Sequence, residues 1–197
     1  MSEHVGKIEV VVGPMFSGKS EELIRRLKRA ALANRPIMTF KPSLDDRWGA
    51  TDRIVSHSRV DFPAAPVPAD KPWAIAEALT DGIAVVGIDE AQFFSAGIVD
   101  VCLALSGKGI RVLVSGLDMD YAGRPFGPVP ALMAVAEKVD KLSAVCTVCG
   151  EPATRTQRLV VSTSLIDIGA GDKYTARCRD HWTLPEEPPH GEEDQSD

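Results

Sequence analysis

Apolar and polar positions alternate in blocks along the first two thirds of the chain. Residues 8–12 form a β-branched run that ends at Gly13, which predicts a buried strand. Residues 20–34 then place apolar side chains on one face and charged side chains on the others, which predicts an amphipathic helix. The chain is therefore expected to open with a strand, a glycine-rich turn and a helix.

The same alternation continues to about residue 138. Apolar runs predict further strands at residues 37–40, 83–89 and 111–117 and helices at 73–79, 97–105 and 130–138. The polar, proline-rich stretch 43–68 has no period and predicts a long loop. Strands that alternate with helices in this way predict an α/β fold, with a parallel sheet and helices on both faces.

The pattern changes after residue 141, where short β-like pieces, cysteine pairs and a glycine-rich segment follow one another. We expect an ATP-binding α/β domain over residues 1–141 and a small β lobe over 142–184. Residues 185–197 are rich in proline and glutamate, which predicts a disordered acidic tail.

Composition and charge narrow the class of protein. The 197 residues are 44% hydrophobic and 25% charged, values typical of a soluble protein with one main core. The formal net charge is −6, but six acidic residues lie in the tail, so the remainder of the chain is neutral. A duplex nucleic-acid binder usually needs a basic face, so no nucleic-acid partner is expected.

Targeting signals are not evident in the sequence. No stretch approaches the roughly 18 apolar residues that a membrane span requires, and the first residues lack the layout of a signal peptide. We therefore expect no membrane partner and a cytoplasmic location. Four cysteines cannot support a disulfide framework in a chain of this length, and a close cysteine pair favours metal or redox chemistry.

Residues 13–20 read Gly-Pro-Met-Phe-Ser-Gly-Lys-Ser, a complete phosphate-binding loop motif between the first predicted strand and helix. In such a loop, backbone N–H groups surround the phosphates at a helix N-terminus, Lys19 neutralises phosphate oxygens, and the Ser20 hydroxyl reaches Mg²⁺. The alternative is an ordinary glycine-rich turn. The motif makes the predicted sheet a P-loop NTPase-like one.

An acidic pair follows the predicted strand at residues 83–89. Asp89 is the candidate metal carboxylate, and Glu90 is the candidate general base toward an attacking hydroxyl or water. The alternative for Glu90 is a solvated charge at a strand end. The candidate cofactor-binding residues are Gly13, Pro14, Met15, Phe16, Ser17, Gly18, Lys19, Ser20, Asp89, Glu90, Ala91 and Gln92.

Two ligand pairs in the β lobe, Cys146 with Cys149 and Cys178 with His181, have the spacing of a structural zinc site. Four ligands complete a tetrahedron and leave no position for water, so the metal would stabilise a lobe that lacks a sufficient core. The alternatives are small buried cysteines and a surface imidazole at His181. Cys102 lies in a helical apolar pattern and is expected in the core.

Several motifs occur in order along the chain. They are the phosphate-loop motif, Gly87-Ile-Asp-Glu-Ala-Gln-Phe-Phe94, Gly116-Leu-Asp-Met-Asp-Tyr121, Pro125-Phe-Gly127 and Lys141-Leu-Ser-Ala-Val-Cys146. Together they resemble the small, zinc-containing cytosolic thymidine kinases of type II, from about Ile8 to His181. The resemblance implies transfer of the γ-phosphoryl group of ATP to the 5′-hydroxyl of thymidine, which gives thymidine monophosphate.

The resemblance also implies roles for individual residues. Glu90 matches the general base, Lys19 and Ser20 the phosphate-loop pair, Asp89 the Mg²⁺ carboxylate beside Ser20, and Arg47 a loop arginine near the transferred phosphate. The positions that match the nucleoside enclosure are Met15, Leu117, Tyr121, Phe126, Thr156 and Tyr174. Tyr121 stands where some family members have phenylalanine, which keeps the ring and adds a hydroxyl.

In the family, a lasso-like loop reads the pyrimidine edge with backbone groups, and residues 162–174, with Gly169 and Gly171, match it. The second Cys/His pair would anchor its far end, so zinc removal is expected to weaken thymidine binding more than ATP binding. His181 stands where many family members have cysteine, and histidine is also a zinc ligand. The resemblance further implies a homotetramer that thymidine triphosphate inhibits.

Two other functions fit parts of the sequence. An ATPase would use Glu90 to activate water, and would hydrolyse ATP without thymidine. A zinc-ribbon module could bind nucleic acid through the arginines near the cysteine pairs, namely Arg155, Arg158, Arg177 and Arg179. We expect this basic cluster to be a solvated face or to reach nucleotide phosphates, because the body of the chain is neutral.

Overall fold

The computed structural model describes residues 6–43, 53–55, 61–159 and 173–184. Its helices and strands are, in chain order, β1 (Lys7–Val12), α1 (Lys19–Leu32), β2 (Ile37–Ser43), β3 (Arg53–Val55), β4 (Asp61–Pro63), β5 (Ala65–Pro68), α2 (Ala74–Glu77), β6 (Val85–Ile88), η2 (Ala91–Phe93), α3 (Ile98–Gly107), β7 (Arg111–Gly116), α4 (Val129–Val135), β8 (Lys138–Lys141), β9 (Ala144–Val145), β10 (Pro152–Ala153), β11 (Arg155–Arg158), β12 (Tyr174–Arg177) and η3 (Arg179–His181).

Six strands form the central sheet, in the order β5-β2-β6-β7-β1-β8. Every neighbouring pair is parallel, and in the β1–β7 pair Val12 lies opposite Gly116. All six carboxyl ends therefore meet at one edge, where the segments after β1, β6 and β7 lie side by side. The predicted parallel α/β sheet is confirmed.

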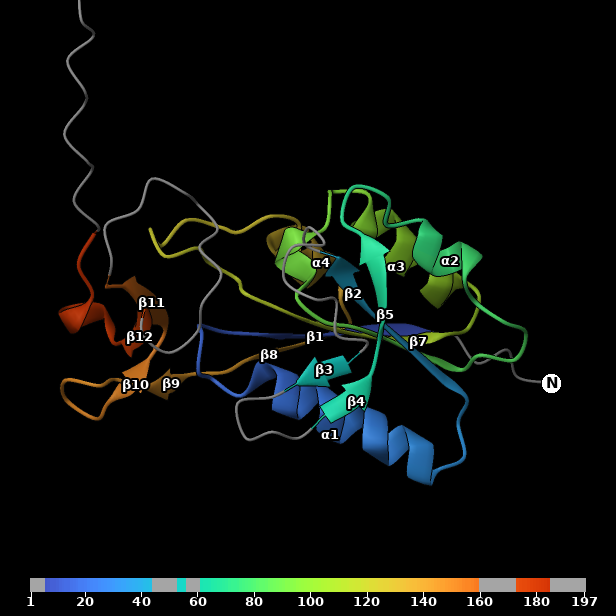
Figure 1. Cartoon of the computed structure of the whole chain (residues 1–197), viewed down its shortest axis with the longest axis horizontal. Coiled ribbons are helices and arrows are strands. Elements are labelled where there is room, and N and C mark those ends of the chain that lie inside the picture. Colours follow the sequence, from blue (N-terminus) through green and yellow to red (C-terminus); the bar gives the residue numbers. More distant parts are fainter. Residues whose placement is uncertain (1–5, 44–52, 56–60, 160–172, 185–197) are drawn as a thin grey trace, which may run out of the picture.

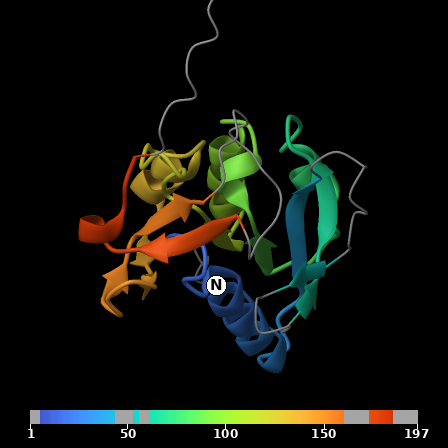
Figure 2. The ribbon, with the colours of Figure 1, turned by 60° about the vertical axis from the view of Figure 1, so that its left-hand side comes forward.

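Helices cover both faces of this sheet, as Figures 1 and 2 show. On one face, Leu27 of α1 belongs to a buried cluster with Leu113 of β7, and the β3–β4 hairpin adds Ile54 to it. On the other face, α2, α3 and α4 pack on the sheet in a second cluster that includes Leu105 and Leu132. The predicted arrangement of helices is confirmed.

Both edge strands differ from the prediction. The expected loop at 43–68 contains β3, β4 and β5 in its described parts, so that prediction is wrong there. Pro66 argued against a strand at the position of β5. An edge strand tolerates proline, however, because one of its sides makes no backbone hydrogen bonds to a neighbouring strand. The predicted helix at 130–138 ends at Val135, and β8 follows it as the other edge. The sequence of β8 contains one apolar residue, Val139, and so shows no strand pattern.

A network of charged side chains connects β1, β7 and β8 of the sheet with α1. Glu9 interrupts the apolar run of β1 and is only 3% exposed. It accepts two hydrogen bonds from Arg111 of β7, at 2.8 and 2.9 Å, and one from Arg26 of α1 at 3.2 Å. Arg26 also bonds Glu22 and, at 2.6 Å, Asp140 of β8. Burial raises the pKa of Glu9, but hydrogen bonds and charges of Arg111 and Lys7 outweigh this and lower it from 4.5 to about 2.

A small lobe, hereafter the Cys/His lobe, follows β8. It consists of two antiparallel strand pairs, β9 with β10 and β11 with β12. Figure 2 shows β11 and β12 on the opposite side of the molecule from β2 and β5. The expected domain boundaries at 141 and 184 stay predictions. The expected lasso loop lies, except for Lys173 and Tyr174, outside the described residues, and so do Arg47, Gly169 and the acidic tail.

Candidate functional site

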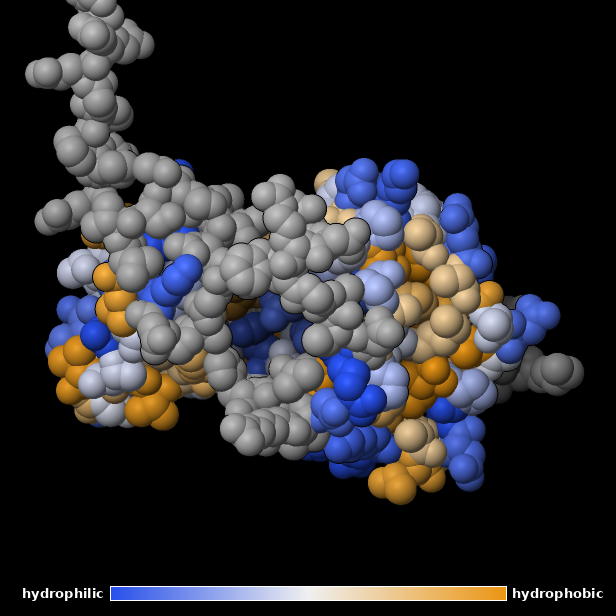
Figure 3. Space-filling view, viewed as in Figure 1, coloured by the Kyte–Doolittle hydropathy of each residue, from blue (hydrophilic) through white to orange (hydrophobic). Residues whose placement is uncertain are grey.

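The phosphate loop joins β1 to α1 in a conformation that its glycines allow. Gly13 has a φ of 143°, and a Cβ there would come within 2.5 Å of the Leu142 carbonyl oxygen. Gly18 has a φ of 83° and precedes the first turn of α1. The loop therefore ends at a helix N-terminus, where free N–H groups favour an anion. Figure 3 shows hydrophilic side chains in this face above the start of α1.

Lys19 lies inside this loop rather than in solvent. Its ammonium group donates a hydrogen bond to the Pro14 carbonyl oxygen at 2.8 Å. Burial lowers the pKa of Lys19, and the negative charges of Glu90, Asp89 and Asp118 act in the opposite direction. The lysine is thus held among acidic groups at the carboxyl edge of the sheet, ready to exchange a loop carbonyl for a phosphate oxygen.

Asp89 and Glu90 follow β6 at the same edge. Asp89 is 5% exposed, and burial together with the charge of Glu90 raises its pKa from 3.8 to about 6, while the hydroxyls of Ser115 and Ser20 act in the opposite direction. The structure thus brings Ser20 and Asp89, the two predicted magnesium ligands, to one place. A bound cation would remove the cost of ionising this buried carboxyl group.

Glu90 is held in a strained backbone conformation. Its φ of 52° lies in the left-handed region, which is uncommon for residues other than glycine. The Gln92 side chain donates a hydrogen bond to the Glu90 carboxylate, and its oxygen accepts one from the Leu117 N–H at 3.0 Å. Gln92, one of the candidate cofactor-binding residues, is 3% exposed and bonds both of these residues.

Asp118 is a residue of this site that the sequence analysis missed. It follows β7, the strand between β6 and β1, and is 6% exposed. One carboxylate oxygen pairs with Lys141 at 2.7 Å. The other, Oδ1, is buried without a hydrogen-bond partner among the described residues. The charge of Asp118 acts on Lys19, and a buried acceptor left over near this lysine fits a site that takes up a hydrated cation.

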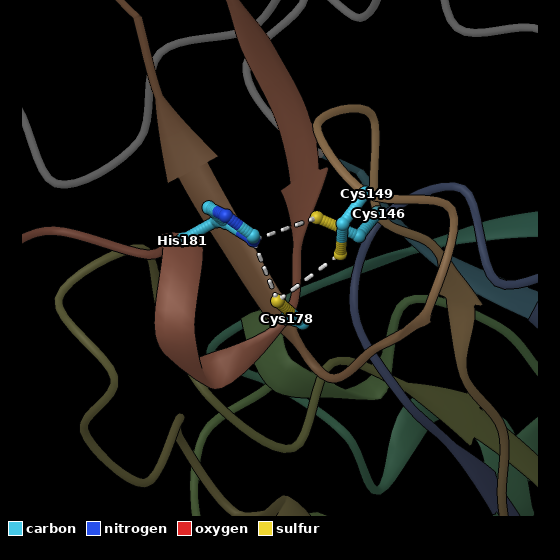
Figure 4. A group of neighbouring side chains, drawn as sticks. All are labelled: Cys146, Cys149, Cys178 and His181. Carbon is cyan, nitrogen blue, oxygen red and sulfur yellow. Dashed lines mark hydrogen bonds between the residues drawn. The ribbon is translucent and has the colours of Figure 1, made fainter.

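The four predicted metal ligands converge in the Cys/His lobe (Figure 4). The ligand atoms of Cys146, Cys149, Cys178 and His181 all lie within 4.8 Å of one another. The Cys149 and Cys178 sulfurs are 3.8 Å apart, and the His181 Nδ1 is 3.1 Å from the Cys178 sulfur. Sulfurs bound tetrahedrally at about 2.3 Å would be about 3.8 Å apart, so this group could hold zinc.

Within the group, the electrostatics favour a thiolate at Cys146, whose charge in turn helps to raise the pKa of Cys149. Burial raises the pKa of Cys146, but backbone N–H groups around Cys178, Cys149 and Val148 outweigh this and lower it to about 6. A metal binds the deprotonated sulfur, so a low thiol pKa lowers the cost of metal binding at neutral pH. Cys102, by contrast, is fully buried in α3, where burial raises its pKa to about 12, and its predicted place in the core is confirmed.

The family model described as thymidine kinase matches residues 6–182 of the chain. The chain belongs to the thymidine kinase family. The match includes the phosphate loop, the acidic pair and all four residues of the possible zinc group, and it supports a thymidine kinase function. The resemblance drawn from the motifs is therefore confirmed. No helix in the described ranges is long and apolar enough to cross a membrane.

The residues that match the nucleoside-enclosing positions of thymidine kinases contact one another, or their neighbours, in pairs or small groups. Phe126 meets Phe93 edge to face at 5.7 Å, so Phe93 joins this region although the sequence left its role undecided. The Met15 N–H donates to the Thr156 hydroxyl at 3.0 Å. Leu117 bonds Gln92 as described above. The roles of these residues toward a nucleoside stay predictions.

Arg158 joins two further residues of this predicted enclosure. Its guanidinium lies 3.7 Å from the centroid of the Tyr121 ring and donates a hydrogen bond to the Tyr174 hydroxyl at 2.9 Å. Arg158 is 6% exposed, so the expectation of a solvated basic face is wrong for it. A buried arginine needs partners from distant segments, and no local pattern in the sequence shows them.

Proposed function

We propose that this chain is an ATP-dependent thymidine kinase, which transfers the γ-phosphoryl group of ATP to the 5′-hydroxyl of thymidine and releases ADP and thymidine monophosphate. One observation carries the proposal: in a chain of the thymidine kinase family, the Lys19 side chain lies among the carboxylates of Asp89, Glu90 and Asp118 at the end of the phosphate loop. This is the charge arrangement that phosphoryl transfer requires, with a cation on the phosphates and a base nearby.

In this mechanism Lys19 leaves the Pro14 carbonyl and binds the phosphate oxygens. Glu90 accepts the proton of the 5′-hydroxyl as the hydroxyl oxygen forms a bond to the γ-phosphorus. The bond from that phosphorus to the bridging oxygen breaks, and ADP leaves with the electron pair. Gln92 positions the Glu90 carboxylate through the hydrogen bond described above.

Mg²⁺, which neutralises charge on the phosphate oxygens when bound, would be held by Ser20 and Asp89. Zinc would be held by the four residues of the Cys/His lobe and would have a structural role. The homotetramer, inhibition by thymidine triphosphate, and a cytoplasmic location stay predictions from the resemblance.

The test is ATP-dependent phosphorylation of thymidine, with deoxycytidine and nucleoside-free controls, by the wild type and Glu90→Gln. We expect transfer to thymidine alone, and a loss of kcat of about 100-fold or more in the variant, because general base catalysis contributes about 10²–10⁴-fold. The matched control is Glu77→Gln, an exposed residue of α2, which should keep full activity. ATP hydrolysis without a nucleoside product would contradict the proposal and favour an ATPase.

A further inference from the structure

Phe16, in the middle of the phosphate loop, contacts the Cys/His lobe instead of the core of the sheet. Its side chain packs against the buried cluster of that lobe, which consists of Ala144, Cys146, Ala153, Ala176 and Cys178. Its φ of 67° is unusual for a residue with a side chain. Such a conformation persists only where surrounding contacts determine it, and the packing of Phe16 against this cluster is one such contact.

A second contact holds the residue before it. The Met15 N–H donates its hydrogen bond to the Thr156 hydroxyl, at 3.0 Å. Thr156 is 5% exposed and lies on β11, which pairs with β12, the strand that leads to Cys178. One N–H group of the phosphate loop is therefore fixed by a buried side chain of the lobe.

The start of the loop also meets the segment that leads into the lobe. The Leu142 N–H donates to the Val12 carbonyl oxygen at 2.8 Å. The Leu142 carbonyl covers Gly13 so closely that only glycine fits there. The loop is thus held at its beginning and at Met15 and Phe16, by residues that follow β8.

Among the described residues, the buried apolar cluster of the lobe is small. It contains three alanines and two cysteines, and the two cysteines, Cys146 and Cys178, belong to the group that could hold a metal. Small side chains bury little apolar area, so we expect a bound metal to contribute to the geometry of this cluster. Phe16 is the large apolar side chain that packs against the cluster, and it belongs to the phosphate loop.

We infer that Phe16 and Thr156 are positioning residues through which the Cys/His lobe sets the shape of the phosphate loop, so that zinc and ATP strengthen each other's binding. The inference rests on the proposed function only in that ATP occupies the phosphate loop. It differs from the expectation that zinc serves mainly thymidine binding, because it requires coupling to ATP when no nucleoside is present.

Reciprocity makes the inference testable from the zinc side. If zinc strengthens ATP binding, ATP must strengthen zinc binding by the same factor, and such couplings are typically about 5- to 150-fold. The full-length, zinc-loaded protein is mixed with a zinc-selective chelator that does not bind Mg²⁺, with or without a saturating non-hydrolysable ATP analogue and Mg²⁺. Because differences in affinity lie mostly in the dissociation rate, we expect the analogue to slow zinc release at least about 5-fold.

Variants separate this coupling from general damage to the fold. For Phe16→Ala, the analogue is used at a concentration that saturates the variant, as judged from the Kd measured for it, and should slow zinc release less than about 2-fold. Phe16→Leu should keep most of the effect. Thr156→Val, which keeps the shape and removes the hydroxyl, should reduce the effect, and Thr156→Ser should restore it. The control Phe62→Ala truncates a half-buried phenylalanine on the α1 face of the sheet and should keep the full effect.

The outcomes are distinct. If the wild type binds the analogue and zinc release is unchanged, or slows only after thymidine is added, the inference is wrong and the proposed kinase function stands. If the wild type does not bind the analogue at all, both are wrong. If Phe62→Ala loses the coupling as completely as Phe16→Ala, the effect is not specific to the loop, which also contradicts the inference.

Discussion

The central sheet and the Cys/His lobe are stabilised by different means. The sheet buries large aliphatic side chains on both faces, among them Ile98 and Leu132 on one side and Leu27 on the other. Among the described residues, the apolar cluster that the lobe buries consists of three alanines and two cysteines, with Phe16 packed against it. The comparison predicts that the lobe depends more than the sheet on a bound metal and on the contact with Phe16.

The largest expected effect is the loss of a metal ligand. Cys178→Ser should weaken zinc binding more than about 100-fold, because it removes a thiolate from a four-ligand group and the remaining cluster is small. Hydrogen exchange should then show β11 and β12 unprotected while β1, β6 and β7 stay protected. Zinc content and exchange, followed together on one sample, measure both.

The matched control for this variant is Cys102→Ser. It also replaces a buried cysteine, but in α3, far from the metal group, so zinc content should be unchanged. If Cys178→Ser exposes the strands of the sheet as much as those of the lobe, the two regions are not independent, and the comparison fails.

A cavity in the core of the sheet should have the opposite effect, a loss of stability without a loss of zinc. Leu27→Ala removes a fully buried side chain that fills the space over Gly87 of β6, where a Cβ would lie 2.9 Å from the leucine. Such truncations cost about 2–5 kcal/mol of unfolding free energy. Urea unfolding should show this loss while the folded variant retains its zinc. The exposed Leu32→Ala of the same helix should change stability little.

The charged network of the sheet gives a smaller, pH-dependent effect. Glu9→Gln removes the charge that Arg111 and Arg26 share, which should cost about 2 kcal/mol. Because the pKa of Glu9 is lowered from 4.5 to about 2, its ionised form stabilises the folded protein above pH 4.5. This stabilisation is lost as the pH falls through about 2.

Urea unfolding at a series of pH values measures this contribution. The wild type should lose stability faster than Glu9→Gln as the pH is lowered from about 5 to 3. Glu21→Gln, an exposed change in α1, is the control and should follow the wild type. Parallel curves for the wild type and Glu9→Gln would show that the buried carboxylate does not stabilise the sheet.

The same contrast explains how far the sequence could be interpreted. Strands such as β1, β6 and β7 were predictable because local apolar runs decide them, and the phosphate loop because its residues are consecutive. The edge strands β5 and β8 were missed because they bury few of their side chains and their sequences contain proline or charge. Their place depends on neighbours that lie far away in the sequence.

Buried polar residues were missed for a related reason. Glu9, Asp118 and Arg158 each pair with residues from other elements, such as Arg111, Lys141 and Tyr174. A charged residue in the sequence is usually exposed, and only the tertiary fold supplies the partner that allows burial. The metal ligands, in contrast, were predictable because two short spacings define them, and the structure brings them together.

The smallest expected effect concerns Tyr121, which lies where the sheet's loops meet the lobe. The Arg158 guanidinium stacks on its ring, and the Trp182 indole N–H donates to its backbone carbonyl oxygen at 3.3 Å. These contacts use the ring and the backbone rather than the hydroxyl. Tyr121→Phe should therefore change the KM for thymidine less than about 2-fold, whereas Tyr121→Leu loses a cation–π contact of about 0.5–2 kcal/mol and should raise it several-fold. Steady-state kinetics at saturating ATP compare the two variants. If Tyr121→Phe and Tyr121→Leu raised the KM equally, the hydroxyl would matter. The stacking of Arg158 on the ring would then not be the only interaction through which Tyr121 connects the loop to the lobe.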